Sequence, residues 1–136
     1  MKQLNAYLLF DGKCREAMSF YQECLGGELK WMTAGEAPMG AQMPPEAQRR
    51  IMHSTLTIGP FVLSASDTFR SETITASNSM ALLIDCSSED EIRALFSKLS
   101  AGGTIIAPLK KEFWGAIFAR FTDKFGKEWM LNCDKP

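Results

Sequence analysis

The stretch that decides the fold is FDGKCREAMSFYQECLGGEL, from Phe10 to Leu29. Its apolar residues recur at helical spacing and form one face of a helix of about three turns. Gly26-Gly27 ends this helix, because glycine accepts the left-handed conformation common at helix C-termini. Apolar segments precede and follow the helix, so the stretch predicts a strand, a helix and a strand in succession. The apolar helix face consists of Cys14, Ala17, Met18, Tyr21 and Leu25.

A second stretch, IDCSSEDEIRALFSKLSAGGTI at residues 84–105, repeats this order. Ser88 and Glu91 have the spacing of a capping box, which predicts the start of a helix. Gly102-Gly103 ends the helix, as the first glycine pair does. Repetition of a supersecondary unit indicates a fold more strongly than any single element. Two copies of one unit are therefore predicted.

Each predicted helix is followed by three apolar segments with the composition of strands. The order is βαβββ twice, in modules of about residues 1–67 and 78–136, and the fold class is α+β. At 136 residues the chain has the length of a single domain. The strands are expected at residues 4–10, 28–34, 51–58, 61–66, 79–85, 104–109, 116–122 and 128–133, with an antiparallel hairpin around Gly59-Pro60.

Two segments are predicted to be irregular. Residues 35–50 contain Pro38, Pro44 and Pro45, and Pro45 favours a short helical turn. A loop of this length in a compact domain is often a lid or a binding loop. Residues 67–78 are polar and rich in serine and threonine, so they predict a linker between the modules.

Composition narrows the class of partner. The chain has 15 Lys and Arg against 16 Asp and Glu, a net charge of −1, which excludes the basic balance of a nucleic-acid-binding protein. No apolar run approaches the roughly 20 residues of a membrane helix. Neither nucleic acid nor a membrane is expected as a partner, and the chain is expected to be cytoplasmic. The four cysteines form no C-x-x-C pair and are expected to be reduced and mostly buried.

Short motifs extend nearly from end to end of the chain. They are Cys14-Arg15-Glu16-Ala17, Phe20-Tyr21, Leu25-Gly26-Gly27-Glu28, Gly35-Glu36-Ala37-Pro38, Ile51-Met52-His53, Ala65-Ser66-Asp67, Phe113-Trp114, Thr122-Asp123-Lys124-Phe125-Gly126 and Trp129-Met130-Leu131-Asn132-Cys133. With the two βαβββ units, they resemble the vicinal oxygen chelate superfamily of glyoxalase I, extradiol dioxygenases and bleomycin-resistance proteins, in its PhnB-like branch. The resemblance implies a curved mixed-sheet cup around a small-molecule site, with the helices outside, and a homodimer.

The resemblance also allows a test for the metal site of the superfamily. Metal-dependent members place His or Glu ligands on the first, fourth, fifth and eighth strands, and counting from the matched motifs brings these places to Ala6, Ser64, Ser79 and Met130. A divalent ion needs imidazole or carboxylate donors, which these residues do not supply. The sequence therefore predicts neither the usual metal nor any other cofactor.

His53 is the one histidine of the chain, and imidazole is the side chain whose ordinary pKa lies near neutrality. It alternates with apolar neighbours on a predicted strand. It is a candidate general acid or base inside the cup; the alternative is a half-buried histidine bonded to backbone. Asp67 follows the next strand and is a candidate to orient His53 across the hairpin; the alternative is a residue that caps the strand end.

Five further residues are candidates to contact a ligand. Aromatic rings and flexible thioethers suit a pocket for an apolar compound, although core packing is the alternative for each. Two functions remain open. One is a binding protein for a small, partly apolar molecule; the other is a small-molecule enzyme, metal-independent or unconventionally metal-dependent, such as a lyase, an isomerase or a dioxygenase-like protein, that uses His53. The five candidates are Trp114, Trp129, Met52, Ser64 and Met130.

Overall fold

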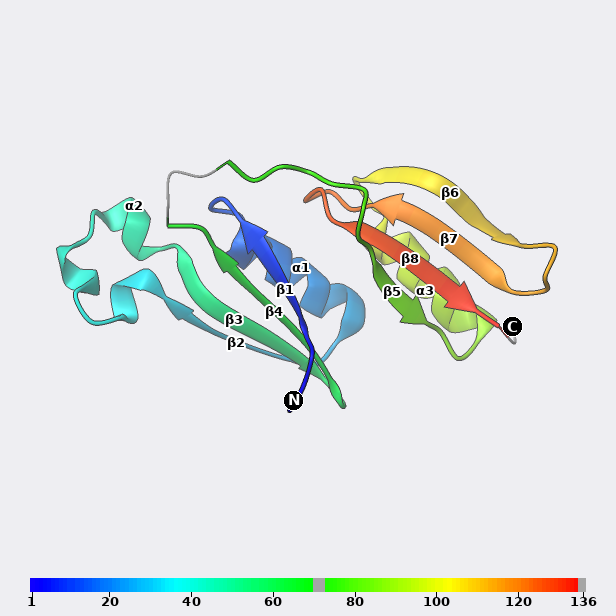
Figure 1. The fold of residues 1–136 in the computed structure, drawn as a ribbon, viewed down its shortest axis with the longest axis horizontal. Helices are drawn as coiled ribbons and strands as arrows, with labels where there is room; N and C mark the ends of the chain where they lie inside the picture. The colour runs from blue at the N-terminus through cyan, green and yellow to red at the C-terminus, as the bar shows by residue number, and fades with distance from the viewer. Residues whose placement is uncertain (70–72, 135–136) are drawn as a thin grey trace. The chain divides into compact units, whose positions relative to one another are not determined.

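The computed structural model of the chain describes residues 1–69 and 73–134. Residues 70–72, within the predicted linker, and 135–136, at the predicted end of the second module, lie outside the described part. The chain divides into two compact units, Met1–Ile74 and Thr75–Pro136. Each unit is built from one four-stranded sheet and the helices that belong to it (Figure 1).

The first unit contains eight described elements. In chain order they are β1 (Ala6–Phe10), α1 (Cys14–Leu25), β2 (Glu28–Thr33), η1 (Ala34–Glu36), η2 (Gly40–Gln42), α2 (Pro45–Gln48), β3 (Ile51–Ile58) and β4 (Phe61–Asp67). The spatial order of the strands is β1-β4-β3-β2. β1 pairs with β4 in parallel, and the other two pairs are antiparallel, including the predicted hairpin of β3 and β4.

The second unit repeats this arrangement. Its described elements are β5 (Leu82–Asp85), α3 (Glu89–Leu99), β6 (Thr104–Lys111), β7 (Ile117–Thr122) and β8 (Glu128–Cys133). The strand order is β5-β8-β7-β6, and β5 pairs with β8 in parallel. The α+β class and the tandem βαβββ order are thus confirmed.

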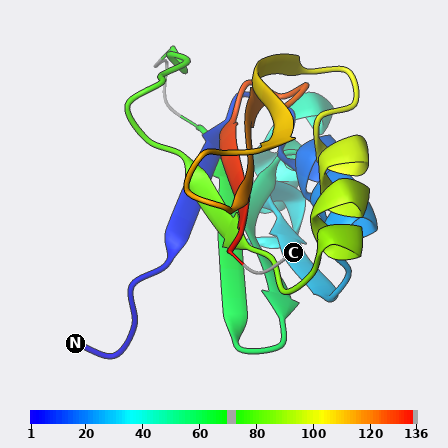
Figure 2. The ribbon, with the colours of Figure 1, turned by 90° about the vertical axis from the view of Figure 1, so that its right-hand side faces the viewer.

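In each unit the helix covers one face of the sheet and leaves the other to side chains of a different kind. Cys14 and Met18 of α1 are fully buried, and the Cys14 thiol lies 3.6 Å from the hydroxyl of Ser54 on β3. In the second unit, the rings of Phe96 on α3 and Phe121 on β7 meet edge to face at 5.8 Å. Figure 2 shows α3 along one side of its sheet. The face of each sheet turned away from its own helix is called the open face below.

The boundaries follow the sequence closely, but three strands, β1, β5 and β7, begin one to three residues later than predicted. α1, β3 and β8 have the predicted limits, and Ser88 caps α3 by accepting a hydrogen bond from the Glu91 amide at 3.1 Å. β5 begins at Leu82 rather than at residue 79, because its ladder with β8 begins at the pair Leu82–Trp129. Apolar composition alone does not show where a strand finds its partner.

The loop before β3 is more ordered than predicted. The expected turn at Pro45 forms α2, and two 3-10 turns precede it. Met39 has the left-handed backbone conformation, with φ 68°, and Gly40 follows it. A Cβ at Gly40 would collide with the carbonyl of Ala34, so only glycine fits this turn. Among the described residues, no helix is long and apolar enough to span a membrane.

Candidate functional site

The open face of the first unit carries an aromatic and imidazole pair. Alternation places Tyr7 and Leu9 of β1 on this face, because their neighbours Leu8 and Phe10 point toward the helix side. On β3 the fully buried Ser54 faces α1, so the exposed His53 projects to the open side. His53 also pairs directly with Met32 of β2. The face therefore combines two polar rings with apolar flanks.

Tyr7 and His53 contact each other across the sheet. The Tyr7 hydroxyl lies 3.3 Å from Nδ1 of His53. The two rings are stacked, with centroids 5.9 Å apart and an interplanar angle of 27°. If the hydroxyl donates to Nδ1, the imidazole proton lies on Nε2; if Nδ1–H donates to the hydroxyl oxygen, Nε2 is a proton acceptor. Among the described residues, Nε2 has no hydrogen-bond partner, so it is open to a ligand in either tautomer.

Two serines make this contact possible. β4 lies between β1 and β3, and its open-face residues are Ser64, directly opposite Tyr7, and Ser66, directly opposite Leu9. Small side chains at these positions leave room for the Tyr7 and His53 rings to lean over the central strand. Ser64 and Ser66 are only 6% and 7% exposed as a result. The predicted ligand contact at Ser64 thus lies beside the pair, on the strand between the two rings.

The structure does not bring Asp67 to His53. One Asp67 oxygen accepts a hydrogen bond from the Cys14 amide at 3.1 Å, and the other accepts one from the Ile51 amide at 2.9 Å. The carboxylate is buried and joins the start of α1 to the start of β3. The predicted orientation of His53 by Asp67 is therefore wrong, and Tyr7 is the residue in contact with the imidazole. Side chains of β1 alternate between the two faces of the sheet, and Phe10 is buried on the helix side. Tyr7, three residues earlier, therefore faces the open side, and this alternation is the signal that points to it.

The same alternation of side chains shows that Ala6, one of the expected metal-ligand positions, does not face the open side. Ala6 pairs with Leu63, which continues to the buried Leu56, so Ala6 faces the helix side rather than the open face. Ser79 precedes β5. In the described part of the chain, no three His, Cys, Asp or Glu side chains are grouped so that they could hold a metal. The donors near His53 are hydroxyls, which do not suit the divalent metal of the superfamily.

The remaining predicted contacts are scattered. Met52 is half-buried at an irregularity where β2 and β3 lose register. Trp129 is 2% exposed and donates its indole N–H to Asp123 at 2.8 Å. It belongs to the core of the second unit, so the predicted ligand contact is wrong for Trp129. Trp114 is 55% exposed in the β6–β7 connection, with its ring edge-on to Phe113 at 4.9 Å.

Met130 lies on the open face of the second unit, beside a charged pair. Its register partners on that face are Leu83 and Arg120. Arg120 Nε lies 3.6 Å from the carboxylate of Glu128, which is almost fully buried. The two atoms that face each other have no hydrogen-bond partner in the described residues. This open face therefore differs in chemistry from that of the first unit.

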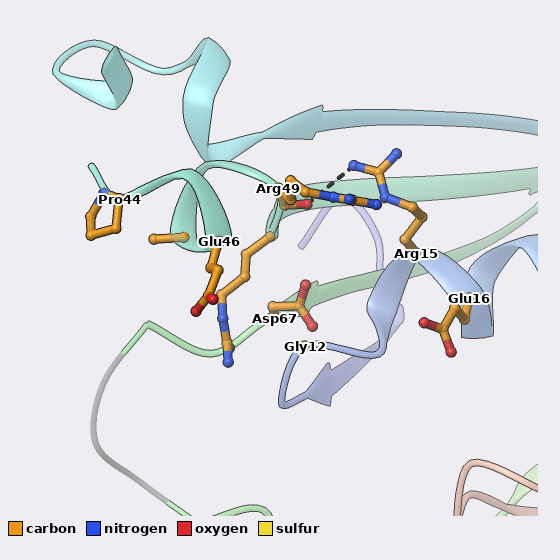
Figure 3. Close-up of a pocket in the computed structure, with 9 residues that line it drawn as sticks. Gly12, Arg15, Glu16, Pro44, Glu46, Arg49 and Asp67 are labelled. Carbon is orange, nitrogen blue, oxygen red and sulfur yellow. Dashed lines mark hydrogen bonds between the residues drawn. The ribbon is translucent and has the colours of Figure 1, made fainter. Parts of the chain in front are cut away.

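A cavity of about 550 Å³ lies near the start of α1, at one end of the first unit (Figure 3). Its charged lining combines three arginines with three carboxylates. Arg50 is held by Asp11 at 2.8 Å and by the Thr68 carbonyl at 2.9 Å, and Arg15 donates to the Arg49 carbonyl at 3.1 Å. These bonds occupy much of the cationic lining, so the cavity carries no net preference for an anion. The charged residues are Arg15, Arg49, Arg50, Glu16, Glu46 and Asp67.

Comparison with known proteins agrees with this architecture over nearly the whole chain. The protein YjdN of Escherichia coli is 33% identical over 141 residues, covering 97% of this chain and 95% of YjdN. The structure of PA1353 from Pseudomonas aeruginosa superposes with a TM-score of 0.89 at 36% identity, with full coverage of both chains. The PhnB protein from Bacillus cereus superposes with a TM-score of 0.79 at 25% identity, covering 97% of this chain and 99% of that one. Residues 3–131 match the family model, and the chain belongs to the glyoxalase/bleomycin resistance protein/dioxygenase superfamily.

Proposed function

We propose that this protein binds a small, partly apolar molecule on the open face of its first unit. The observation that carries the proposal is the Tyr7–His53 contact of 3.3 Å above two buried serines. A stacked pair of polar rings on an exposed sheet face offers a π-surface together with hydrogen-bonding atoms. Leu9 and Met32, both substantially exposed, add apolar contact on either flank.

The composition of the face defines the class of ligand. The charged residues of β2 on this face, Lys30 and Glu28, lie opposite Thr55 and Thr57 and pair with each other at 3.6 Å. Between the two rings the polar atoms are the Tyr7 hydroxyl, the serine hydroxyls and His53 Nε2. These atoms match a neutral ligand with one hydroxyl, carbonyl or ring nitrogen and an apolar body. A planar ligand would stack on the ring pair, and its polar group would reach Nε2.

The single histidine gives a direct test. Its ring protons form one identifiable set in a proton NMR spectrum, since the chain has no other histidine. We would titrate the protein with a panel of phenols, aromatic ketones and ring-nitrogen heterocycles and follow these signals together with the thermal midpoint. At least one of these probes is expected to shift the His53 signals saturably and to raise the midpoint. A panel that moves neither signal contradicts the proposal.

Matched variants locate the binding. Ser66→Leu adds bulk to β4 between the two rings, so it is expected to weaken the best probe at least tenfold. Thr57→Leu adds the same kind of bulk on the open side of β3, but toward its other end, opposite Val62. It should leave the affinity unchanged. Equal effects of the two variants would show that the probe binds elsewhere.

The second candidate function is acid–base catalysis by His53. It is favoured by the open Nε2, because Nδ1 is already oriented by Tyr7 and a proton can be exchanged at the other nitrogen. In this case the best probe or a close analogue is converted, and mass spectrometry of the reaction mixture detects a product. His53→Gln should abolish turnover and retain binding within about tenfold, because glutamine preserves a hydrogen-bonding end group. Binding without any product would support the binding function and contradict catalysis.

We also propose that the protein is a homodimer with no tightly held metal. Exposed apolar side chains on the open faces, including Leu9 and Leu83, would gain from cover by a second copy. Light scattering after size exclusion should give twice the mass of the 15.1 kDa chain. Elemental analysis of untagged protein should find less than about a tenth of an equivalent of zinc, nickel, manganese or iron, since the described residues contain no group of three His, Cys, Asp or Glu side chains that could hold such an ion. A monomer, or a stoichiometric metal, would overturn the respective part.

A further inference from the structure

Two cysteines of the second unit lie directly opposite each other on neighbouring strands. The parallel ladder of β5 and β8 runs from Leu82–Trp129 to Asp85–Asn132. It continues one step further, because the amide of Cys86 donates to the carbonyl of Asn132 at 2.6 Å. In a parallel ladder this bond makes Cys86 the partner of the residue after Asn132, which is Cys133.

Register partners in a sheet project to the same side. Neighbouring strands are separated by about 4.8 Å, and a disulfide requires Cα atoms roughly 4.4–6.8 Å apart, so the backbone spacing suits an S–S bond. Cys133 is on the side of the buried Leu131, which faces α3. Cys86 is 8% exposed and Cys133 is 1% exposed. Both are free thiols in this structure.

We propose that Cys86 and Cys133 form a reversible disulfide when the protein meets a peroxide. The other two cysteines, Cys14 and Cys24, are buried in the first unit on the same helix, ten positions apart in sequence. Residues ten apart on an α-helix are separated by about 15 Å along its axis, so they cannot bond to each other. The second unit alone contains a pair with the spacing of a disulfide.

The chemistry needs one oxidant molecule for each bond. With hydrogen peroxide, the Cys86 sulfur, which is the more exposed, attacks one oxygen; the O–O bond breaks, water leaves and a sulfenic acid forms. The Cys133 sulfur then attacks the oxidised sulfur, the S–O bond breaks and a second water leaves. Two thiols and one peroxide thus give one disulfide and two waters, and the two electrons lost by the thiols reduce the peroxide. An added dithiol reverses the step by exchange.

The reaction is expected to be slow rather than sensor-like. Burial first, and then the charges of Glu91, Cys133 and Asp85, raise the pKa of the Cys86 thiol to about 11. The thiolate is the reacting form, so little of it exists at neutral pH. Once formed, the bond would join β8, the last strand of the chain, to β5 and resist its separation from the sheet. The disulfide would therefore stabilise the fold under sustained oxidation.

Peptide mapping of the wild-type protein tests the proposal without any variant. The native protein is treated with hydrogen peroxide over several hours, its remaining thiols are alkylated, and it is digested without reduction. The expected result is a cross-linked peptide pair that contains Cys86 and Cys133 and disappears on reduction. The thermal midpoint should rise by roughly 5 °C or more, since the bond constrains the unfolded chain.

Variants distinguish the pair from general oxidation. Cys86→Ser and Cys133→Ser should each remove both the cross-link and the rise in midpoint, whereas Cys24→Ser, a matched loss of a buried thiol in the other unit, should retain both. Oxidation of Cys86 to sulfinic acid without a cross-link would overturn the proposal. So would unchanged thiols in the wild-type protein after prolonged treatment with peroxide and then with diamide.

Discussion

Both units contain a buried aspartate at the end of a strand, but the two carboxylates bind very different parts of the chain. Asp67 accepts from the amides of Cys14 and Ile51, which are far from it in sequence. Asp123 accepts from the amides of Phe125 and Lys127, at 2.8 and 3.0 Å, and from the indole of Trp129. One aspartate connects three separate elements, and the other organises the turn in which it lies. Two similar units are thus stabilised by hydrogen bonds of different range. The contacts of Asp67 are called the long-range bracket below, and those of Asp123 are called the local bracket.

The largest effect is expected at the local bracket. Asp123→Ala removes an acceptor shared by three donors and leaves the buried indole N–H of Trp129 without its partner. Bonds to a charged acceptor contribute about 1.5–3 kcal/mol each and do not add fully, so a loss of about 5 kcal/mol is expected. Urea denaturation measures it. Trp129→Phe removes the indole donor and part of the buried ring but leaves the two backbone bonds to Asp123, so it is the control and should lose less. An equal loss would attribute the effect to packing of the ring.

Asp67→Ala is expected to cost about 3 kcal/mol, because two donors lose a charged acceptor. The loss should be visible in hydrogen exchange at the first turn of α1 and at the start of β3, whereas Asp123→Ala should expose its own turn. Asp67→Asn keeps one carbonyl acceptor and should recover part of the stability. If the two alanine variants increased exchange in the same segments, the distinction between long-range and local brackets would fail.

Each unit also contains one buried thiol that makes stability depend on alkaline pH. Burial, the largest cause, raises the pKa of Cys14 from 9.0 to about 11, and Cys86 has a similarly raised value. The folded state keeps these protons after the unfolded chain has lost them, so stability is full below pH 9 and falls between pH 9 and 11. Each thiol is expected to contribute about 2 kcal/mol to this decline.

Urea unfolding at pH 8 and at pH 10.5 measures the decline. Cys14→Ala should reduce the pH dependence by about half, because the Cys86 contribution remains. Stability that rose with pH in the wild-type protein would contradict the sign, and an unchanged slope in Cys14→Ala would assign the dependence to other groups.

The smallest expected change in stability is at the proposed site. Tyr7→Phe removes an exposed hydroxyl whose contact with His53 is 3.3 Å, so it should alter the free energy of unfolding by less than about 0.5 kcal/mol. The same variant should weaken binding of the best probe and move the His53 ring signals, since the rings would lose their hydrogen bond. A large loss of stability would show that the Tyr7–His53 contact stabilises the fold rather than serving a binding site.

The contrast between the brackets also explains what the sequence could predict. The helices, the strands and the duplication follow from periodicity and glycine pairs, which are local signals. The turn around Asp123 belongs to a short motif, Thr122 to Gly126, that was visible in the sequence. The contacts of Asp67 were not, because they depend on which distant amides the folded sheet brings to it. Its expected partner, His53, faces the other side.

The candidate site shows the same limit. The strand of His53 could be inferred, but not the side to which the ring points, and its partner Tyr7 lies two strands away in space, beyond β4. A count from the helix chose Ala6, one residue earlier, and in a strand one residue reverses the face. Trp129 was expected at a ligand because its size suits both a pocket and a core. The hydrogen bond from its indole to Asp123 is what assigns Trp129 to the core.

The two small serines of β4 have a consequence for how this surface can change. The ladder on both sides of the strand is formed by backbone groups, while Ser64 and Ser66 fill the space above it. Replacing either serine therefore alters the shape of the open face without removing a bond that aligns the strands. The sheet can therefore stay intact while substitutions at Ser64 or Ser66 change the shape of its open face. A single substitution on β4 is enough to change which compounds a related protein accepts there.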